Sequence, residues 1–193
     1  VQLYYSTDHH WTSDGAYEAY KIAIKKLGFK KYKVFEPLVV KNDFKGTLYS
    51  KSGFTNGLSD EIKIYVPKNE KIYKNSVIDY PDDTDKTTEF YQLKNLDTKD
   101  AYTVFGGSNY PMYTIKTPVK NRQRLLLIKD SYANSMIPML SQYYREIVVV
   151  DPRYYFENLN DLIQVEGITD VLFLYNANTF AGDDSLAMML ESK

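Results

Sequence analysis

Two short segments of the chain hold residue types that could carry out nucleophilic chemistry together. Residues 8–11 place Asp8 two positions before His10, and residues 129–135 place Ser131 directly after a run of apolar residues. A serine hydroxyl becomes a useful nucleophile when a base accepts its proton. The chain contains two histidines, His9 and His10, and no cysteine. Imidazole chemistry is therefore confined to residues 9–10, and a cysteine nucleophile is excluded.

The spacing of Asp8 and His10 suits an aspartate that orients an imidazole. In an extended segment, side chains two residues apart point to the same side, so we expect Asp8 and His10 to share a side and His9 to face away. An aspartate so placed would hold the imidazole tautomer, as in a Ser-His-Asp triad. Three other interpretations remain open at this point: a surface histidine pair, an Asp8 that caps a turn, and a metal site. The metal site would need Asp8, His9, His10 and further carboxylates from elsewhere.

Ser131 lies where a predicted strand ends and a predicted helix begins. Residues 125–128 form a continuous apolar run, as in a buried parallel strand, and residues 133–144 have helical spacing. A hydroxyl at such a junction lies above the carboxyl edge of the sheet, where open α/β folds bind ligands. The N–H groups that begin the helix could stabilise an oxyanion. The alternative is that Asp130 or Ser131 only caps the helix.

The remaining pattern predicts an α/β fold with a parallel sheet. A helix is expected over residues 16–27, capped by Thr12 or Ser13 and ended by Gly28. Residues 31–120 alternate in short runs, at 33–36 and 62–66, between turn clusters at 51–53, 55–57 and 81–85, and so predict a β-rich insertion. Residues 121–193 predict strands at 125–128, 147–150 and 171–174, with helices at 133–144, 159–165 and 184–190. We interpret residues 1–193 as a single domain.

Composition excludes some classes of function. The 24 basic and 25 acidic side chains give a formal net charge of −1, which argues against a nucleic-acid binder or a polybasic membrane-surface protein. No apolar run approaches the roughly 20 residues of a membrane span. The 19 tyrosines suit a glycan-binding surface and core packing equally well. Because the chain begins at Val1 rather than Met, we expect it to be part of a longer protein.

The two segments also resemble motifs of a known family. Residues 4–12, followed by Gly15, Ala16 and Tyr17, resemble the motif that names the bacterial DHHW protein family. They are also similar to the Tyr-x-x-x-Asp-x-His-Trp stretch of the alginate O-acetyltransferases AlgX and AlgJ. Residues 129–135 resemble the Asp-Ser nucleophile motif of these proteins, and residues 150–155 are typical of them.

This resemblance implies an SGNH-hydrolase-like (GDSL-type), flavodoxin-like fold that acts on acyl esters of cell-surface polysaccharide. Carried over by position, Ser131 is the nucleophile, His10 the general base and Asp8 its orienting partner. The implied reaction is O-acetyl transfer. The alternatives are a carbohydrate O-deacetylase or esterase and a non-catalytic glycan-binding or assembly module. The family's small polar residue between Asp and His is replaced here by His9. The strands that the family places before the motif are absent from this chain, so its sheet is expected to be incomplete.

The resemblance also implies further site residues and partners. Gly107 and Asn109 are the candidates for the oxyanion hole, against a flexible turn at the same loop or the use of Asn176 and Asn178 instead. Substrate contacts are expected from four residues: His9, Trp11, Tyr132 and Arg153. No metal or organic cofactor is expected. The expected partners are a polysaccharide, an acyl donor and a membrane-bound acyl-transfer protein, without nucleic acid. The implied location is extracytoplasmic.

Overall fold

The computed structural model describes residues 1–53, 57–81 and 86–191, and the chain divides into two compact units. The first unit comprises Val1–Glu70, Phe90–Ser108 and Asn134–Met139. The second comprises Lys71–Glu89, Asn109–Ala133 and Leu140–Lys193. Both units therefore mix distant parts of the sequence, and each is described by itself.

In the first unit, helix α1 (Ser13–Lys26) confirms the predicted helix and begins three residues earlier. The side chain of Thr12 caps it by accepting a hydrogen bond from the N–H of Gly15. Ala16, Tyr20 and Ile24 recur every four residues and are all fully buried, so they define the inner face of the helix. Gly28 follows the helix with a positive φ of 85°, which glycine adopts without strain.

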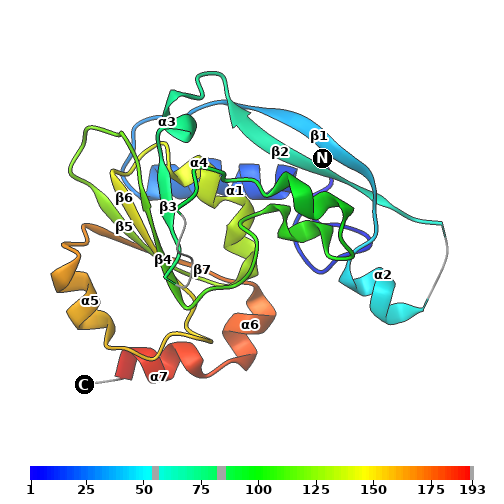
Figure 1. Cartoon of the computed structure of the whole chain (residues 1–193). Coiled ribbons are helices and arrows are strands. Elements are labelled where there is room, and N and C mark those ends of the chain that lie inside the picture. The colour runs from blue at the N-terminus through cyan, green and yellow to red at the C-terminus, as the bar shows by residue number, and fades with distance from the viewer. Residues whose placement is uncertain (54–56, 82–85, 192–193) are drawn as a thin grey trace. The chain divides into compact units, whose positions relative to one another are not determined.

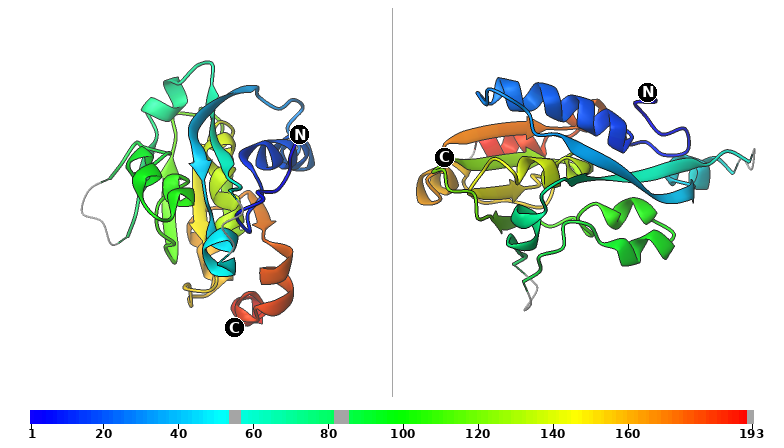
Figure 2. Two further views of the ribbon diagram at one scale, coloured as in Figure 1. Left: turned by 90° about the vertical axis from the view of Figure 1, so that its right-hand side faces the viewer. Right: turned by 90° about the horizontal axis from the view of Figure 1, so that it is seen from above.

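A two-stranded antiparallel sheet forms the rest of this unit's framework (Figures 1 and 2). Strand β1 (Phe35–Phe44) pairs with β2 (Asp60–Pro67), and the short helix α2 (Thr47–Ser52) lies in the connection between them. Ile62 and Ile64 alternate along β2 and are buried, which confirms the strand predicted at 62–66. They pack with side chains of the 3₁₀ helix η2 (Ala101–Val104), which follows η1 (Leu93–Asp97).

The second unit contains a five-stranded mixed sheet rather than the parallel sheet expected from the sequence. Its strands are β3 (Val77–Asp79), β4 (Met112–Lys116), β5 (Arg124–Lys129), β6 (Glu146–Val150) and β7 (Asp170–Leu174), in the order β3-β4-β6-β5-β7. Only β6, β5 and β7 are parallel to one another. Strand β4 pairs antiparallel with both β6 and β3.

The two antiparallel strands come from the region predicted as a separate β-rich insertion. Tyr113 and Ile115 alternate along β4 and are buried, and Ile115 lies opposite Ile147 of β6. This buried cross-strand pair stabilises the attachment of β4 to β6. The predicted insertion therefore contributes to both units instead of forming one body of its own.

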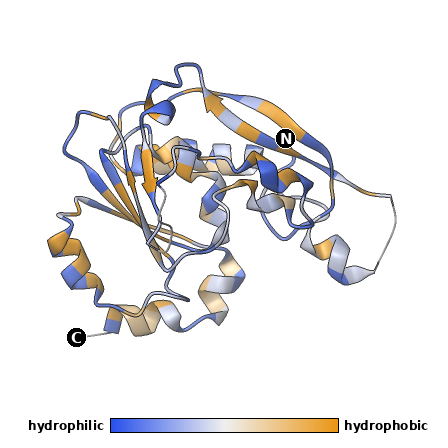
Figure 3. Ribbon diagram, in the orientation of Figure 1, coloured by the Kyte–Doolittle hydropathy of each residue, from blue (hydrophilic) through white to orange (hydrophobic). Residues whose placement is uncertain are grey.

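Helices cover the parallel strands through an apolar core. Leu126 and Ile128 of β5 pack with Leu159 of α5 (Leu159–Val165) and Met189 of α7 (Ser185–Glu191). The strands stand out as apolar in Figure 3. Strands β5, β6 and β7 and helices α5 and α7 match the predicted strands and helices within two residues. Helices α3 (Lys71–Lys74) and α6 (Ala177–Gly182) were not predicted.

The helix predicted over residues 133–144 is instead broken into a 3₁₀ turn, η3 (Ser131–Ser135), and one turn of α-helix, α4 (Ile137–Leu140). Pro138 lacks a backbone N–H and cannot extend a helix that precedes it, which accounts for the break. The predicted turn clusters at 55–57 and 81–85 fall largely outside the described residues. Among those that are described, no helix is both long and apolar enough to cross a membrane.

Candidate functional site

The Asp-His segment is a loop whose two ends are tied together. Tyr4 pairs with Trp11 in an antiparallel bridge. The N–H of Tyr5 donates to the carbonyl of His10 at 3.2 Å, and the N–H of Thr12 donates to the carbonyl of Leu3 at 2.9 Å. Residues 6–10 between these contacts form bends. The loop thus holds its residues in a fixed, non-helical conformation immediately before α1.

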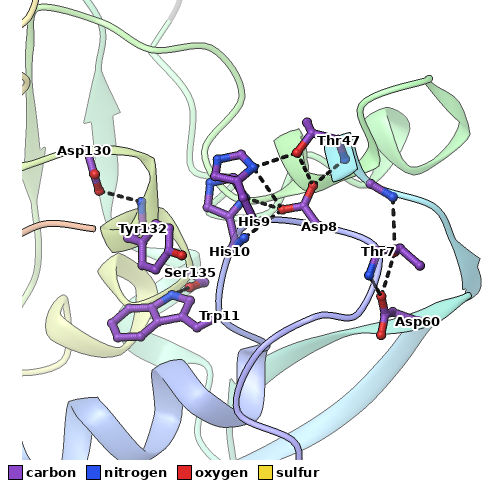
Figure 4. Close-up of polar contacts among 11 residues, drawn as sticks. Thr7, Asp8, His9, His10, Trp11, Thr47, Asp60, Asp130, Tyr132 and Ser135 are labelled. Atoms are coloured by element: carbon purple, nitrogen blue, oxygen red, sulfur yellow. Dashed lines mark hydrogen bonds and ion pairs between the residues drawn. The ribbon is translucent and has the colours of Figure 1, made fainter. Parts of the chain in front are cut away.

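A buried carboxylate at the start of β2 anchors the tip of this loop. Asp60 accepts hydrogen bonds from the N–H of Ser6 at 3.1 Å, from the N–H of Thr7 at 2.8 Å and from the hydroxyl of Thr7 at 2.6 Å. The hydroxyl of Thr7 also accepts from the N–H of Gly46 at 3.2 Å. The two-stranded sheet and the β1–α2 connection together position the residue that follows, Asp8 (Figure 4).

Asp8 and His10 form the hydrogen-bonded pair that the sequence predicts. Oδ1 of Asp8 lies 2.6 Å from Nδ1 of His10 and accepts the N–H of His10 at 3.0 Å. Oδ2 accepts the N–H and the hydroxyl of Thr47 at 2.8 and 3.1 Å. Only 2% of Asp8 and 5% of His10 is exposed. The two side chains therefore form a buried unit with a saturated carboxylate.

The charge of Asp8 determines which ring nitrogen of His10 carries the proton. Burial raises the pKa of Asp8, but hydrogen bonds from His10 and Thr47 and the charge of His10 outweigh it, so the pKa lies well below its ordinary value. An ionised carboxylate only accepts hydrogen bonds. Nδ1 of His10 must then carry the proton, and in the neutral ring the lone pair lies on Nε2. This is the tautomer that a general base requires.

Two further residues shape the pair, and neither could be identified from the sequence. The ring of Tyr102 stacks on His10, with centroids 3.6 Å apart and planes 9° apart. Gly46 lies so close to Asp8 that an added Cβ would overlap its carboxylate oxygen Oδ2. Both come from segments distant from residues 8–10, and neither belongs to a motif that points to Asp8 or His10.

His9 does not face away from the pair, contrary to the expectation from an extended backbone. Its ring centroid lies 3.9 Å from that of His10. Its Nδ1 lies 2.7 Å from the hydroxyl oxygen of Thr47 and 3.6 Å from Oδ1 of Asp8. The backbone here bends, and the period-two alternation of a strand does not apply. His9 is nevertheless the exposed member of the segment.

One observation favours a metal site at Asp8, His9 and His10, and another argues against it. Asp8, His9 and His10 each offer a ligand atom within 4.8 Å of the others, and in the described part of the chain no fourth acidic, His or Cys side chain joins them. However, both oxygens of Asp8 already accept hydrogen bonds, and 2.6 Å between Oδ1 and Nδ1 of His10 is a hydrogen-bond distance. The arrangement suits proton chemistry better than coordination.

Ser131 belongs to the second unit, at the carboxyl end of β5 and the first position of η3. The preceding residue, Asp130, accepts the N–H of Tyr132 at 2.9 Å and the N–H of Asn176 at 2.9 Å. Asp130 thus performs the capping role that the sequence left open for either residue. Asp8 and His10 lie in the first unit, so their catalytic pairing with Ser131 is a proposal.

The two oxyanion-hole candidates belong to different units. Gly107, in the first unit, has a φ of 71°, and its N–H donates to the carbonyl of Thr103 at 2.9 Å. This hydrogen bond would have to be exchanged before that N–H could stabilise an oxyanion. Asn109 belongs to the second unit and is exposed. Of the alternatives, Asn176 caps α6 by accepting the N–H of Asn178 at 2.8 Å.

The remaining substrate-contact candidates differ in accessibility. Nε1 of Trp11 donates to Oγ of Ser135 at 3.1 Å, and both residues are in the first unit. In the second unit, Tyr132 is buried, and the guanidinium of Arg153 makes two hydrogen bonds to Asp151, at 2.9 and 2.6 Å. That pairing with Asp151 raises the pKa of Arg153 despite burial.

One buried charged residue of the second unit was not identified from the sequence. Lys129 is 1% exposed and lies 3.8 Å from Asp151. Burial lowers its pKa to about 8, although the charge of Asp151 opposes this shift. It lies within the sequence block 129–135 and is the last residue of β5, but the sequence assigned it no role.

Comparison with known proteins places the chain in a family. The family model described as DHHW protein matches residues 1–150. A DHHW family protein from Eubacterium siraeum DSM 15702 is 27% identical, with a TM-score of 0.78 over 100% of this chain and 66% of that chain. Among curated proteins, no significant match was found.

Two structures of Bacillus cereus PatB1 are also similar. One is 25% identical, with a TM-score of 0.76 over 95% of this chain and 65% of that chain. The other, with a sulfonyl adduct, is 24% identical, with a TM-score of 0.77 over 100% of this chain and 64% of that chain. The chain thus spans slightly less than two thirds of the length of these three structures. Since the family model covers more than three quarters of its residues, the chain belongs to the DHHW protein family.

Proposed function

We propose that this protein carries out acyl-ester chemistry with Ser131 as nucleophile, His10 as general base and Asp8 as the residue that orients His10. The observation that carries the proposal is the 2.6 Å hydrogen bond between Oδ1 of Asp8 and Nδ1 of His10. It leaves the lone pair of neutral His10 on Nε2, the atom that must accept the serine proton.

In the proposed reaction, Oγ of Ser131 attacks the carbonyl carbon of an acyl ester while its proton moves to Nε2 of His10. The tetrahedral intermediate collapses, the C–O bond to the leaving alcohol breaks, and His10 returns the proton to that alcohol. An acceptor hydroxyl then gives its proton to His10 and attacks the acyl-serine, the bond between the acyl carbon and Oγ breaks, and His10 returns the proton to Oγ of Ser131. Asp8 remains ionised throughout and stabilises the imidazolium.

The acceptor decides between transfer and hydrolysis. A sugar hydroxyl gives O-acetyl transfer to a polysaccharide outside the cytoplasm, which is the reaction that the family resemblance favours. Water gives a deacetylase or esterase with the same acyl-enzyme. Gly107 and Asn109 are proposed as oxyanion donors, and a membrane-bound protein as one source of the acyl group. The sulfonyl adduct reported for PatB1 suggests the probe, because sulfonyl groups attach covalently to activated nucleophiles.

The test combines a covalent probe with turnover of a small ester. The protein and its Ser131→Ala and His10→Ala variants are incubated with phenylmethanesulfonyl fluoride, and the site of attachment is mapped by mass spectrometry. We expect attachment at Ser131, much slower labelling of His10→Ala, and hydrolysis of an acetyl ester by the unsubstituted protein alone. Labelling at another residue, or equal hydrolysis by Ser131→Ala, would refute the assignment of the nucleophile.

A further inference from the structure

We propose that Thr47 is a positioning residue that fixes the Asp8–His10 pair and sets the tautomer of His9. The inference rests on the proposed function only in its effect on turnover, because the proton positions can be measured separately. Thr47 is the first residue of α2, 39 residues from Asp8 in the sequence, and it is half-buried.

The carboxylate of Asp8 divides its hydrogen bonds between two partners. Oδ1 receives the two donors of His10, and Oδ2 receives the N–H and hydroxyl of Thr47. A carboxylate held at only one oxygen can rotate about its Cβ–Cγ bond, whereas one held at both oxygens cannot. Thr47 therefore fixes the plane of Asp8, and through it the direction in which Oδ1 faces His10.

The hydroxyl of Thr47 also links Asp8 to His9. The hydroxyl of Thr47 has one hydrogen and lies 3.1 Å from Oδ2 of Asp8 and 2.7 Å from Nδ1 of His9. If that hydrogen goes to the carboxylate, which only accepts, the oxygen must accept a hydrogen from Nδ1 of His9. The two histidines then both carry Nδ1–H, one donating to Thr47 and the other to Asp8.

Packing around the carboxylate leaves little freedom for another arrangement. Gly46, immediately before Thr47, lies directly against Asp8, and any larger residue there would overlap it. Tyr102 stacks on the face of the His10 ring. The hydroxyl of Thr47 is therefore the adjustable contact in an otherwise tightly packed pair, and its removal should loosen the pair without removing either catalytic group.

The experiment uses the fact that the chain has only two histidines. Protein labelled with ¹⁵N at the imidazole nitrogens is compared as the native sequence, Thr47→Val and Thr47→Ser, with His9→Gln to assign the signals. We expect the native protein to show both histidines as Nδ1–H tautomers and a low-field proton on His10. Thr47→Val should shift His9 toward the other tautomer and weaken the His10 signal, and Thr47→Ser should restore both.

A matched control separates these effects from general destabilisation. Thr117 of the second unit is also half-buried, and its hydroxyl donates to the carbonyl of Tyr144 at 2.6 Å. Thr117→Val should leave the histidine signals unchanged. In turnover, Thr47→Val should lower kcat about tenfold with little change in KM, as the loss of one hydrogen bond to a charged group would predict.

Each outcome decides one question. Unchanged tautomers and an unchanged His10 proton in Thr47→Val would overturn the positioning role, whatever the turnover. Full activity of Ser131→Ala would overturn the proposed function but would leave the spectroscopic result to decide the role of Thr47. Failure of Thr47→Ser to restore the signals would show that the shape of the side chain, and not its hydroxyl, is what matters.

Discussion

The indole nitrogen of Trp11 donates a hydrogen bond to the hydroxyl oxygen of Ser135, at 3.1 Å, across 124 residues of sequence. Trp11 follows His10 directly, and Ser135 ends the 3₁₀ turn that begins at Ser131. One residue from each of the two motifs predicted from the sequence therefore takes part in the same contact within the first unit.

A double-mutant cycle should detect this contact. Trp11→Phe and Ser135→Ala each remove one partner, and we expect each to lower the free energy of unfolding by about 1 kcal/mol beyond any packing loss. The double variant should lose less than the sum, by about 0.5–1.5 kcal/mol. Urea denaturation measures all four proteins. Strict additivity would mean that the hydrogen bond contributes nothing to stability.

The elements that were predicted well are those with strong local signals. The Ala16, Tyr20 and Ile24 face of α1, and the apolar runs of β5 and β6, carry their period or their burial in the sequence itself. The helix expected at 133–144 failed because its apolar residues are buried on every side rather than on one face. In addition, Pro138 has no N–H to continue the turn that precedes it, which separates η3 from α4.

The residues of the candidate site also differ in whether a local sequence signal marks them. Asp8 and His10 are two residues apart and therefore close together in any backbone conformation, which is why their pairing was predicted although the segment bends and is not extended. Thr47, Gly46 and Tyr102 reach the pair only through tertiary contacts, and no local pattern marks them. The position of His9 was predicted wrongly because a strand was assumed where the chain bends.

The two histidines should differ sharply in their effect on turnover. His10→Ala removes the base and should lower kcat at least about a thousandfold. His9→Ala removes a contact to Thr47 and should cost no more than about tenfold. Acetyl-ester hydrolysis measures both, with circular dichroism to confirm folding. If His9→Ala were inactive and His10→Ala active, the base would have to be reassigned to His9.

Asp8 should stabilise the protein in a pH-dependent manner. Its pKa in the folded state lies below the ordinary value of 3.8, so its contribution is complete above that value. As the pH falls, Asp8 becomes protonated in the unfolded chain at a higher pH than in the folded protein, and this favours unfolding. The contribution of Asp8 is therefore lost as the pH falls through its folded-state pKa. The stability difference between the native sequence and Asp8→Asn should therefore shrink as the pH falls from 5 toward 2. A difference that is constant over this range would contradict the assigned pKa direction.

Gly46→Ala should disturb Asp8 without altering any polar group. The added Cβ would overlap the carboxylate of a buried residue, and overpacking of this kind costs about 1–3 kcal/mol. The His10 Nδ1 proton signal should weaken as well. Gly182→Ala is the matched control, because Gly182 ends α6 with open space around its Cβ position and no positive φ. The idea fails if both variants have the same stability and the same histidine spectrum.

Replacement of the buried Lys129 should stabilise the protein at neutral pH. Burial lowers the pKa of Lys129 from 10.5 to about 8, and a shift of that size corresponds to about 3 kcal/mol against the charged form. Lys129→Met removes this cost, while Asp151 keeps its two hydrogen bonds from Arg153. This net cost already includes the opposing attraction to Asp151, and we expect a gain of about 1–3 kcal/mol at pH 7.

The pH dependence identifies the cause of that gain. Below pH 8 the lysine is charged in both states and the cost is complete. Between pH 8 and 10.5 the unfolded chain holds the proton that the folded protein has lost, so stability rises with pH. The advantage of Lys129→Met should accordingly decline across this interval, as followed by urea denaturation at each pH. Lys33→Met provides a comparison, since the pKa of Lys33 is also lowered by burial but its side chain is more exposed. An advantage of Lys129→Met that did not change between pH 7 and 10 would indicate better packing rather than relief of a buried charge.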